Sequence, residues 1–138
     1  WEDVLSFDGT TGPYVQYTYA RAKSILRKSR CAADIKDTKI YDEICVEALT
    51  DDITFGLIKT LSGYEDAVKR AAEQYEPSVI ARYIIRVAAA FNQFYQACPI
   101  LREENENVRS ARLSVVDVAQ RVLKDACGLL GVKCPEEM

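Results

Sequence analysis

Apolar side chains recur every three or four residues along most of this chain, and this spacing limits the fold more than any other feature of the sequence. The pattern is clearest in two segments. The first runs from Ser78 to Ala97 and is ended by Pro99, and the second follows the charged segment 102–107 and is ended by Gly131. Each segment predicts a long helix with a broad apolar face. The inward positions that we expect are Ile80, Tyr83, Ile84, Val87, Ala88, Phe91 and Tyr95 in the first helix, and Ala111, Val115, Val118, Ala119, Val122, Leu123, Ala126 and Leu130 in the second.

Three shorter helices are predicted upstream. One runs from Pro13 to about Ser29, because proline suits the first position of a helix. A second covers residues 50–62, which open with a capping sequence, and a third covers residues 64–74.

Residues 31–50 are acidic and weakly periodic. We expect a connection there, with a short helical piece from about Asp42 to Leu49. No alternating strand pattern and no internal repeat is visible in the sequence. The sequence therefore predicts an all-α fold in which residues 1–138 form one helical bundle of about five helices.

The chain of 138 residues contains no histidine, and its 18 Lys and Arg against 21 Asp and Glu give a formal net charge of −3. Without histidine there is no Ser/His/Asp or Cys/His catalysis and no His-ligated metal site. Glycine-rich phosphate loops of the GxGxxG or GxxxxGKS/T type are also absent from the sequence. We therefore expect no catalytic residue, no cofactor site and no metal site in this chain.

The cysteine pattern and the hydropathy suggest a compartment. An odd number of cysteines, with no CxxC pair and no signal sequence, fits structural thiols in a reducing cytoplasm. A thiol-based enzyme would need a base for its cysteine, and histidine is absent. The longest uncharged run, between Arg86 and Arg102, is too short and too polar to cross a bilayer. We expect a cytoplasmic protein that does not contact membranes. The cysteines are Cys31, Cys45, Cys98, Cys127 and Cys134.

Positive charge is concentrated around the first predicted helix. Between Gly9 and Ala33 there are five basic residues and no acidic one, although the whole chain is acidic. At helical spacing, one face carries tyrosines beside cations and the opposite face is apolar. Such a surface suits single-stranded nucleic acid, because splayed bases stack on rings and phosphates need positive charge. The alternative is an ordinary solvated basic face. The tyrosine-bearing face comprises Tyr14, Tyr17, Arg21, Ser24 and Lys28, and the apolar face comprises Val15, Tyr19, Ala22 and Leu26.

Two further segments bear on function. Residues 34–66 hold nine acidic side chains against three lysines, so this part of the chain would repel nucleic acid. Adjacent helical residues do not face each other, so helix capping explains Asp51 and Asp52 better than an acid–base or metal pair. The segment Phe91–Gln96 combines rings with amides such as Asn92, which can stack on a base and hydrogen-bond to its edge. The alternative is a core segment with a polar rim.

Several stretches together resemble one known family, the C-terminal anticodon-binding domain of arginyl-tRNA synthetase. The similarity extends over nearly the whole chain and is weakest at residues 31–50. The stretches that carry it include Phe7-Asp8-Gly9-Thr10-Thr11-Gly12-Pro13-Tyr14-Val15-Gln16-Tyr17, Glu76-Pro77-Ser78, Phe91-Asn92-Gln93-Phe94-Tyr95, Ala111-Arg112-Leu113 and Pro135-Glu136-Glu137-Met138.

This resemblance implies a helical bundle of the DALR type, attached to a class I catalytic domain, that binds the anticodon stem-loop of arginine tRNA. The central cytosine common to arginine anticodons is the base expected to be recognised, and the parent enzyme would use ATP and Mg²⁺. Arg21 and Lys28 are expected to contact phosphates, and Asn92 to contact a base. The resemblance implies a loop near the anticodon made by Asp8, Gly9, Thr10, Thr11, Gly12 and Pro13, and anticodon contacts from Tyr14, Tyr17, Tyr95 and Met138.

The chain departs from the family pattern in two ways. Thr18 stands where alanine is common, and Ala126 with Cys127 where glycine followed by leucine or methionine is usual. We expect these departures to alter packing and to leave recognition unaffected. The class I signatures HIGH and KMSKS are absent, so this chain, which begins at Trp1 and resembles a domain cut from a longer protein, is not expected to activate arginine. A free-standing relative that acts as a helical protein-interaction module is the alternative function.

Overall fold

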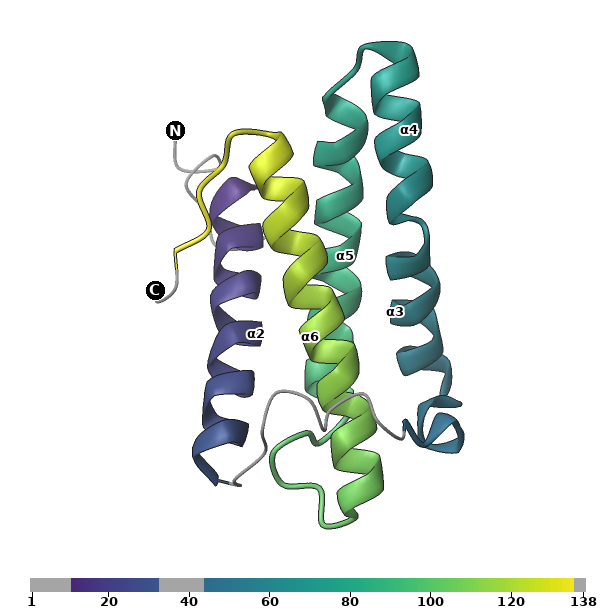
Figure 1. The fold of residues 1–138 in the computed structure, drawn as a ribbon, viewed down its shortest axis with the longest axis vertical. Coiled ribbons are helices and arrows are strands. Elements are labelled where there is room, and N and C mark those ends of the chain that lie inside the picture. Colours follow the sequence, from purple (N-terminus) through teal and green to yellow (C-terminus); the bar gives the residue numbers. More distant parts are fainter. Residues whose placement is uncertain (1–10, 33–43, 136–138) are drawn as a thin grey trace.

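The computed structural model describes residues 11–32 and 44–135, with side chains for all of these except residues 30–32. This part of the chain forms five α-helices and one short 3-10 helix, so the predicted all-α bundle is confirmed (Figure 1). The elements are α2 (Gly12–Ala32), the 3-10 helix η1 (Val46–Leu49), α3 (Asp52–Ser62), α4 (Tyr64–Gln74), α5 (Ser78–Ala97) and α6 (Glu106–Leu129).

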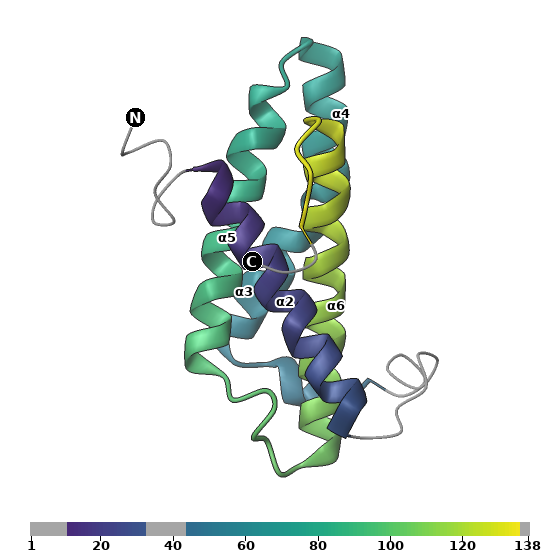
Figure 2. The same cartoon turned by 90° about the vertical axis from the view of Figure 1, so that its left-hand side faces the viewer.

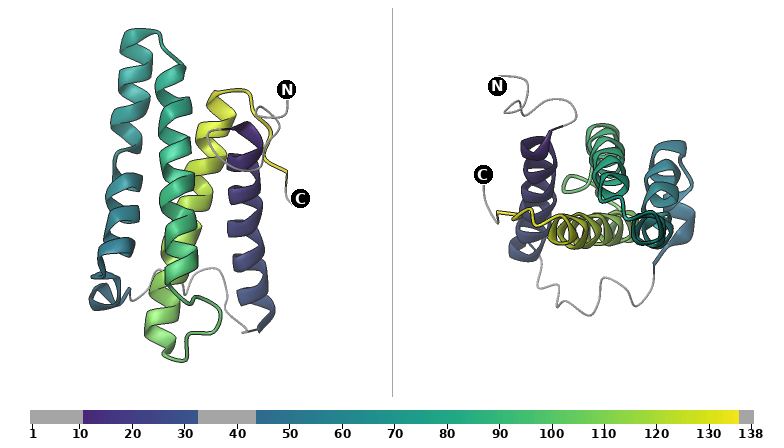
Figure 3. Two further views of the ribbon diagram at one scale, coloured as in Figure 1. Left: turned by 180° about the vertical axis from the view of Figure 1, so that it is seen from behind. Right: turned by 90° about the horizontal axis from the view of Figure 1, so that it is seen from above.

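Helix α5 lies at the centre of the bundle and contacts α2, α3, α4 and α6. Helices α3 and α4 follow one another along one side of it, and α2 lies on the other side (Figure 1). Figure 2 shows α2 running diagonally across its side of the bundle. The view along the long axis places α5 and α6 between α2 and the α3–α4 pair (Figure 3). This arrangement brings α2 directly against α5.

The core consists mainly of the apolar faces that helical spacing predicts. Phe91 of α5 and Leu123 of α6 are completely buried, and burial of a side chain of this kind contributes about 1.5–3 kcal/mol. Two expected core positions are wrong, because Tyr95 and Val118 are exposed. Val118 lines an apolar surface hollow between η1, α3 and α6, where Ile44 also lies.

Side-chain caps explain where two helices begin. The carboxylate of Asp51 accepts a hydrogen bond from the backbone N–H of Thr54 at 2.9 Å, so the capping interpretation of this residue is confirmed. The side chain of Asn105 accepts a hydrogen bond from the backbone N–H of Asn107 at 3.0 Å. Helix α6 therefore begins directly after Asn105, inside the segment 102–107 that the sequence predicts to be a loop.

Other boundaries also differ from the prediction. Helix α2 extends to Ala32 instead of Ser29. The helical piece expected from Asp42 to Leu49 is limited, among the described residues, to the 3-10 helix Val46–Leu49; residues 42 and 43 lie outside them. A 3-10 helix seldom exceeds three or four residues because its hydrogen-bond geometry is poor, and the residue before this turn, Cys45, makes no side-chain capping hydrogen bond.

Candidate nucleic-acid interface

Helix α2 presents the two faces that its residue spacing predicts. Val15, Tyr19 and Ala22 are buried against the bundle. Tyr17 and Lys28 are exposed on the other side. The predicted apolar face is therefore buried, and Tyr17 and Lys28 of the tyrosine-bearing face are accessible to solvent.

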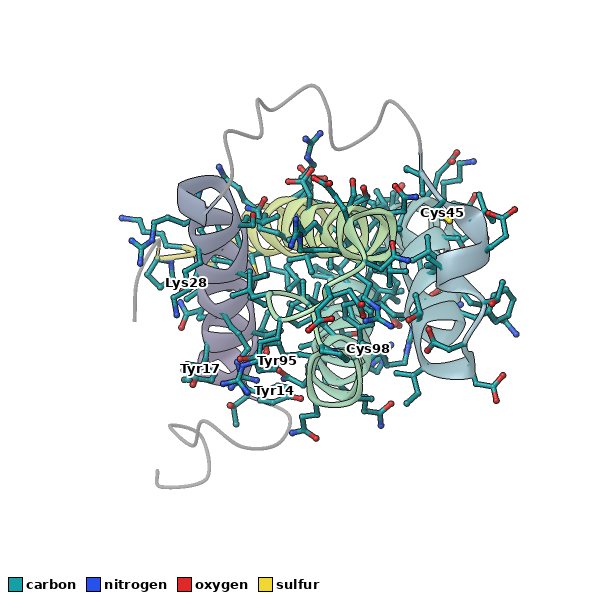
Figure 4. All side chains as sticks on the ribbon, turned by 90° about the horizontal axis from the view of Figure 1, so that it is seen from below. Tyr14, Tyr17, Lys28, Cys45, Tyr95 and Cys98 are labelled. Carbon is teal, nitrogen blue, oxygen red and sulfur yellow. The ribbon has the colours of Figure 1, made fainter. Side chains whose placement is uncertain are left out.

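Arg21 lies at the centre of a cluster shared by α2 and α5. Its guanidinium carbon is 4.6 Å from the ring centroid of Tyr17 and 5.0 Å from that of Tyr95. Both distances are within the range of cation–π interactions. Figure 4 shows both tyrosines, with Tyr14, on the same side of the molecule, where α2 lies beside α5. Because Tyr17 and Tyr95 remain 40% and 42% exposed, each ring keeps surface available to a ligand.

Asn92 connects the guanidinium to the interior of the helix pair. The Nη1 atom of Arg21 donates a hydrogen bond to Oδ1 of Asn92 at 2.6 Å. The Nδ2 atom of Asn92 donates to the hydroxyl of Thr18 at 3.0 Å, and this hydroxyl donates to the backbone carbonyl of Tyr14 at 2.9 Å. We call Tyr17, Arg21, Asn92 and Tyr95 the tyrosine–arginine cluster.

The cluster combines aromatic surface with an oriented positive charge. Its rings offer faces on which nucleobases can stack, and a guanidinium can donate several hydrogen bonds in its plane. Part of the donor capacity of Arg21 is used by Asn92, so this cation is held in place by the protein. A base that stacked on a ring face covered by Arg21 would have to displace the guanidinium, so a ligand would use the exposed parts of the two rings instead.

A surface hollow of about 550 Å³ lies next to the cluster and has Tyr95 in its wall. Ile25 of α2 and the residues that follow α5, including Cys98, Pro99 and Ile100, form most of the rest. Its lining is mainly apolar and its mouth is open, so it can receive a flat apolar group beside the ring of Tyr95.

Not all predicted site residues come together. Tyr14 is half-buried and packs partly against the hydrophobic core. Lys28 is seven residues after Arg21, which corresponds to about 10 Å along the helix axis. In Figure 4 it lies further along α2 than the three tyrosines do. The structure thus unites Tyr17, Arg21, Asn92 and Tyr95 and leaves Lys28 apart from them.

The expected loop before α2 is only partly described. The hydroxyl of Thr11 accepts a hydrogen bond from the backbone N–H of Tyr14 at 3.3 Å, so Thr11 helps to begin the helix. Gly12 and Pro13 belong to the first turn of α2 and do not form a loop, because the chain is already helical there. Asp8, Gly9, Thr10 and Met138 lie outside the described residues.

Two polar residues of α2 that the sequence analysis did not select make contacts at this side of the bundle. The side-chain amide of Gln16 donates to the backbone carbonyl of Lys133 at 2.7 Å, which holds the segment after α6 against α2. Thr18 bonds to Asn92 and is completely buried. Helical spacing groups Thr18 with the buried face and gives no sign of its polar partner.

The chain matches the family model described as "DALR anticodon binding domain" over residues 15–138. It therefore belongs to the DALR anticodon-binding domain family. The chain is 47% identical over its full length to the arginine–tRNA ligase of Clostridium acetobutylicum and 45% identical to that of Alkaliphilus metalliredigens, and in each case it spans 23% of the relative's length.

Solved structures agree with this assignment. The arginyl-tRNA synthetase of Thermus thermophilus superposes with a TM-score of 0.80 and 38% identity, and that of Plasmodium falciparum with 0.76 and 26%. Each alignment covers 97% of this chain and 22% of the solved one.

The remaining expectations concern metals and membranes. Within residues 11–32 and 44–135, no group of three or more Cys, Asp or Glu side chains is placed to hold a metal ion. In the same residues no helix has the length and apolar character needed to cross a membrane. Cys45, Cys98, Cys127 and Cys134 are free thiols.

Proposed function

We propose that this chain is the C-terminal domain of an arginyl-tRNA synthetase and that it binds the anticodon stem-loop of arginine tRNA. The observation that carries the proposal is the position of the Arg21 guanidinium over the rings of both Tyr17 and Tyr95. Such a domain catalyses no covalent step itself. It holds the anticodon so that the acceptor end of the tRNA reaches the catalytic domain of the parent enzyme, which we infer to act in the cytoplasm.

In this proposal the bases of the anticodon loop stack on the exposed parts of the Tyr17 and Tyr95 rings. Stacking of one base on an aromatic side chain contributes roughly 1–3 kcal/mol. The hollow beside Tyr95 gives an unstacked base room to leave the loop. The central cytosine is the base that we expect to be recognised, with Tyr14 and Met138 as further contacts at the same loop.

Phosphate contacts come from a second group of residues. Arg21 keeps guanidinium N–H groups beyond the one bonded to Asn92, and Lys28 extends the positive surface along α2. Phosphate contacts position the RNA and carry no sequence information by themselves. We therefore expect Lys28 to contribute affinity without base preference. The segment Asp8–Pro13 precedes this surface and is proposed to approach the anticodon.

ATP and Mg²⁺ belong to the parent enzyme in this proposal. Among the described residues no three or more Cys, Asp or Glu side chains are grouped so as to hold a metal ion, and the sequence has no glycine-rich phosphate loop. We therefore assign both to the catalytic domain, and the chain alone should bind tRNA without activating arginine.

The test measures fluorescence anisotropy of a labelled arginine-tRNA anticodon hairpin, and of the same hairpin with its central cytosine replaced, at low and moderate salt. The wild-type chain should prefer the cytosine hairpin. Tyr95→Ala and Tyr14→Ala should weaken binding, whereas Tyr75→Ala should not. Tyr75 is a suitable control because it is 92% exposed between α4 and α5, away from the cluster.

The logarithm of the binding constant falls linearly with the logarithm of the salt concentration. Lys28→Ala should make this fall less steep by about 0.7–0.9 for each phosphate contact that it removes. Lys59→Ala, an exposed lysine of α3, is the matched control and should leave the slope unchanged. Equal binding to both hairpins would mean that the surface binds phosphates without recognising the central base. Absence of binding by a folded wild-type chain would favour a protein-interaction module.

A further inference from the structure

We infer that Thr18 is a positioning residue of the tyrosine–arginine cluster, which acts through Asn92 to hold the Arg21 guanidinium against Tyr17 and Tyr95. The side chain of Thr18 is completely buried. Its hydroxyl lies 3.0 Å from Nδ2 of Asn92, whose Oδ1 lies 2.6 Å from Nη1 of Arg21. Only the consequence for RNA binding rests on the proposed function.

The direction of each hydrogen bond in this relay follows from the groups at its two ends. A guanidinium can only donate, so the atom of Asn92 that faces Arg21 must be the carbonyl oxygen. At the other end, the backbone carbonyl of Tyr14 can only accept, so the hydroxyl of Thr18 uses its single proton there at 2.9 Å. The lone pairs of this hydroxyl are then available to accept from Nδ2 of Asn92.

The hydroxyl of Thr18 therefore supports, from the other end of the Asn92 amide, the orientation that the guanidinium requires. If the amide were turned by half a rotation, its NH₂ group would face the NH₂ group of Arg21 at a distance of 2.6 Å, which places two donors in contact. Nδ2 would lose its acceptor as well. Removing the hydroxyl takes away the partner that holds the amide with its oxygen toward the arginine.

This role differs from the packing effect that the sequence predicts for a threonine at this position. A methyl group in place of the hydroxyl would fill the same space and leave the core contacts nearly unchanged. The methyl group cannot accept a hydrogen bond, so Nδ2 of Asn92 would lose the Thr18 hydroxyl as its acceptor. Asn92, the hydrogen-bond partner of Arg21 on α5, would then be less firmly oriented. The guanidinium would then be held by an amide that has lost one of its two partners and by the two ring contacts, which are weak at exposed positions.

The direct test is an NMR measurement on the 138-residue chain without RNA. Ring currents of Tyr17 and Tyr95 should displace the δ-methylene resonances of Arg21 upfield, and Arg21→Lys identifies these signals. We expect Thr18→Val to move them toward ordinary arginine values and Thr18→Ser to retain the wild-type shifts. Thr18→Ala removes the same hydroxyl with a good helix former and serves as the second variant if Thr18→Val folds poorly.

Thr60→Val is the matched control. Its hydroxyl also donates to the carbonyl four residues earlier, Gly56, at 2.8 Å, but it lies on α3 away from the cluster. This variant should lose the same kind of backbone contact and leave the Arg21 resonances unchanged. Arg21 resonances that stay at their wild-type positions in both Thr18→Val and Thr18→Ala would overturn the inference, whatever the effect on stability.

Hairpin binding separates this inference from the proposed function. If both hold, Thr18→Val should bind the cytosine hairpin roughly 2- to 12-fold more weakly, the effect of one net hydrogen bond, and Thr18→Ser should restore binding. If the wild-type chain binds no hairpin but the Arg21 resonances still respond to loss of the hydroxyl, the positioning role stands and the proposed function fails. If binding is normal and the resonances do not respond, the positioning role is wrong.

Discussion

The phenol of Tyr83 joins α5 to the end of α3, and its ionisation gives a quantitative prediction for the stability of the bundle. Its hydroxyl donates to the backbone carbonyls of Thr60 at 3.0 Å and Leu61 at 3.2 Å. The side chain is only 3% exposed. Burial raises the pKa of Tyr83 from 10.0 to about 12, against the opposing effect of the nearby Arg86 guanidinium.

Because the pKa is higher in the native state, the unfolded chain loses its phenol proton first as the pH rises. The stabilisation is complete below pH 10 and is lost between about pH 10 and 12, at roughly 1.4 kcal/mol for each pH unit. Over this window the loss attributable to Tyr83 is about 2–3 kcal/mol. Tyr83→Phe removes the single proton that the two carbonyls share, which costs about 0.5–1.5 kcal/mol at neutral pH, and it has no phenol to ionise.

The assay is urea unfolding followed by circular dichroism at a series of pH values from 7 to 11.5. The wild-type chain should be the more stable at pH 7, and its advantage over Tyr83→Phe should shrink above pH 10. Other groups titrate in both proteins and cancel in the difference. The neighbouring phenol of Tyr64 also has a raised pKa, because of burial and then the hydrogen bond to Asp125. Tyr64→Phe is therefore measured in parallel to separate its contribution from that of Tyr83. A difference that stays constant with pH would refute the reasoning.

Three further predictions concern the caps, the thiols and the core. Asp51→Ala should lower the free energy of unfolding by about 1 kcal/mol in chemical denaturation, and Asp52→Ala, in the first turn, by less. Cys127 should resist a thiol reagent in the native state because it is buried and its pKa is raised to about 12, whereas the partly exposed Cys45 should react before it in a time course read by mass spectrometry. Phe94→Ala should cost about 3–5 kcal/mol in the same denaturation assay.

The sequence was sufficient for those features that depend on neighbours along the chain. Helix α4 has the predicted bounds, 64–74, and α5 ends before Pro99 as expected. The buried face of α2 follows from spacing alone, because side chains three or four residues apart share a helix face. Asp51 caps α3 through a group three residues away, which is also a local interaction.

Features that depend on contacts between distant segments could not be predicted from spacing. Asn92 and Arg21 are 71 positions apart, and only the packing of α2 on α5 brings them to 2.6 Å. The same packing explains the wrong prediction for Tyr95. Its spacing continues the apolar pattern of α5, but at this height α5 faces Arg21, so the ring stays partly exposed. Periodicity identifies a helix face, and the partner of that face depends on the tertiary arrangement.

The proposed binding of RNA by a chain of net charge −3 is explained by where its charges lie. The cations of α2 are on one side of the bundle, and acidic residues such as Asp52 and Glu65 are on α3 and α4 at the other side (Figure 1). A surface with so few cations makes few phosphate contacts, and each adds only about 0.7–0.9 to the salt slope. In the proposed function, most of the affinity is therefore expected from stacking and base contacts at Tyr17 and Tyr95. A domain of this kind gains more from a correctly oriented Arg21 than from added positive charge, and this explains why a buried hydroxyl such as that of Thr18 can matter for recognition.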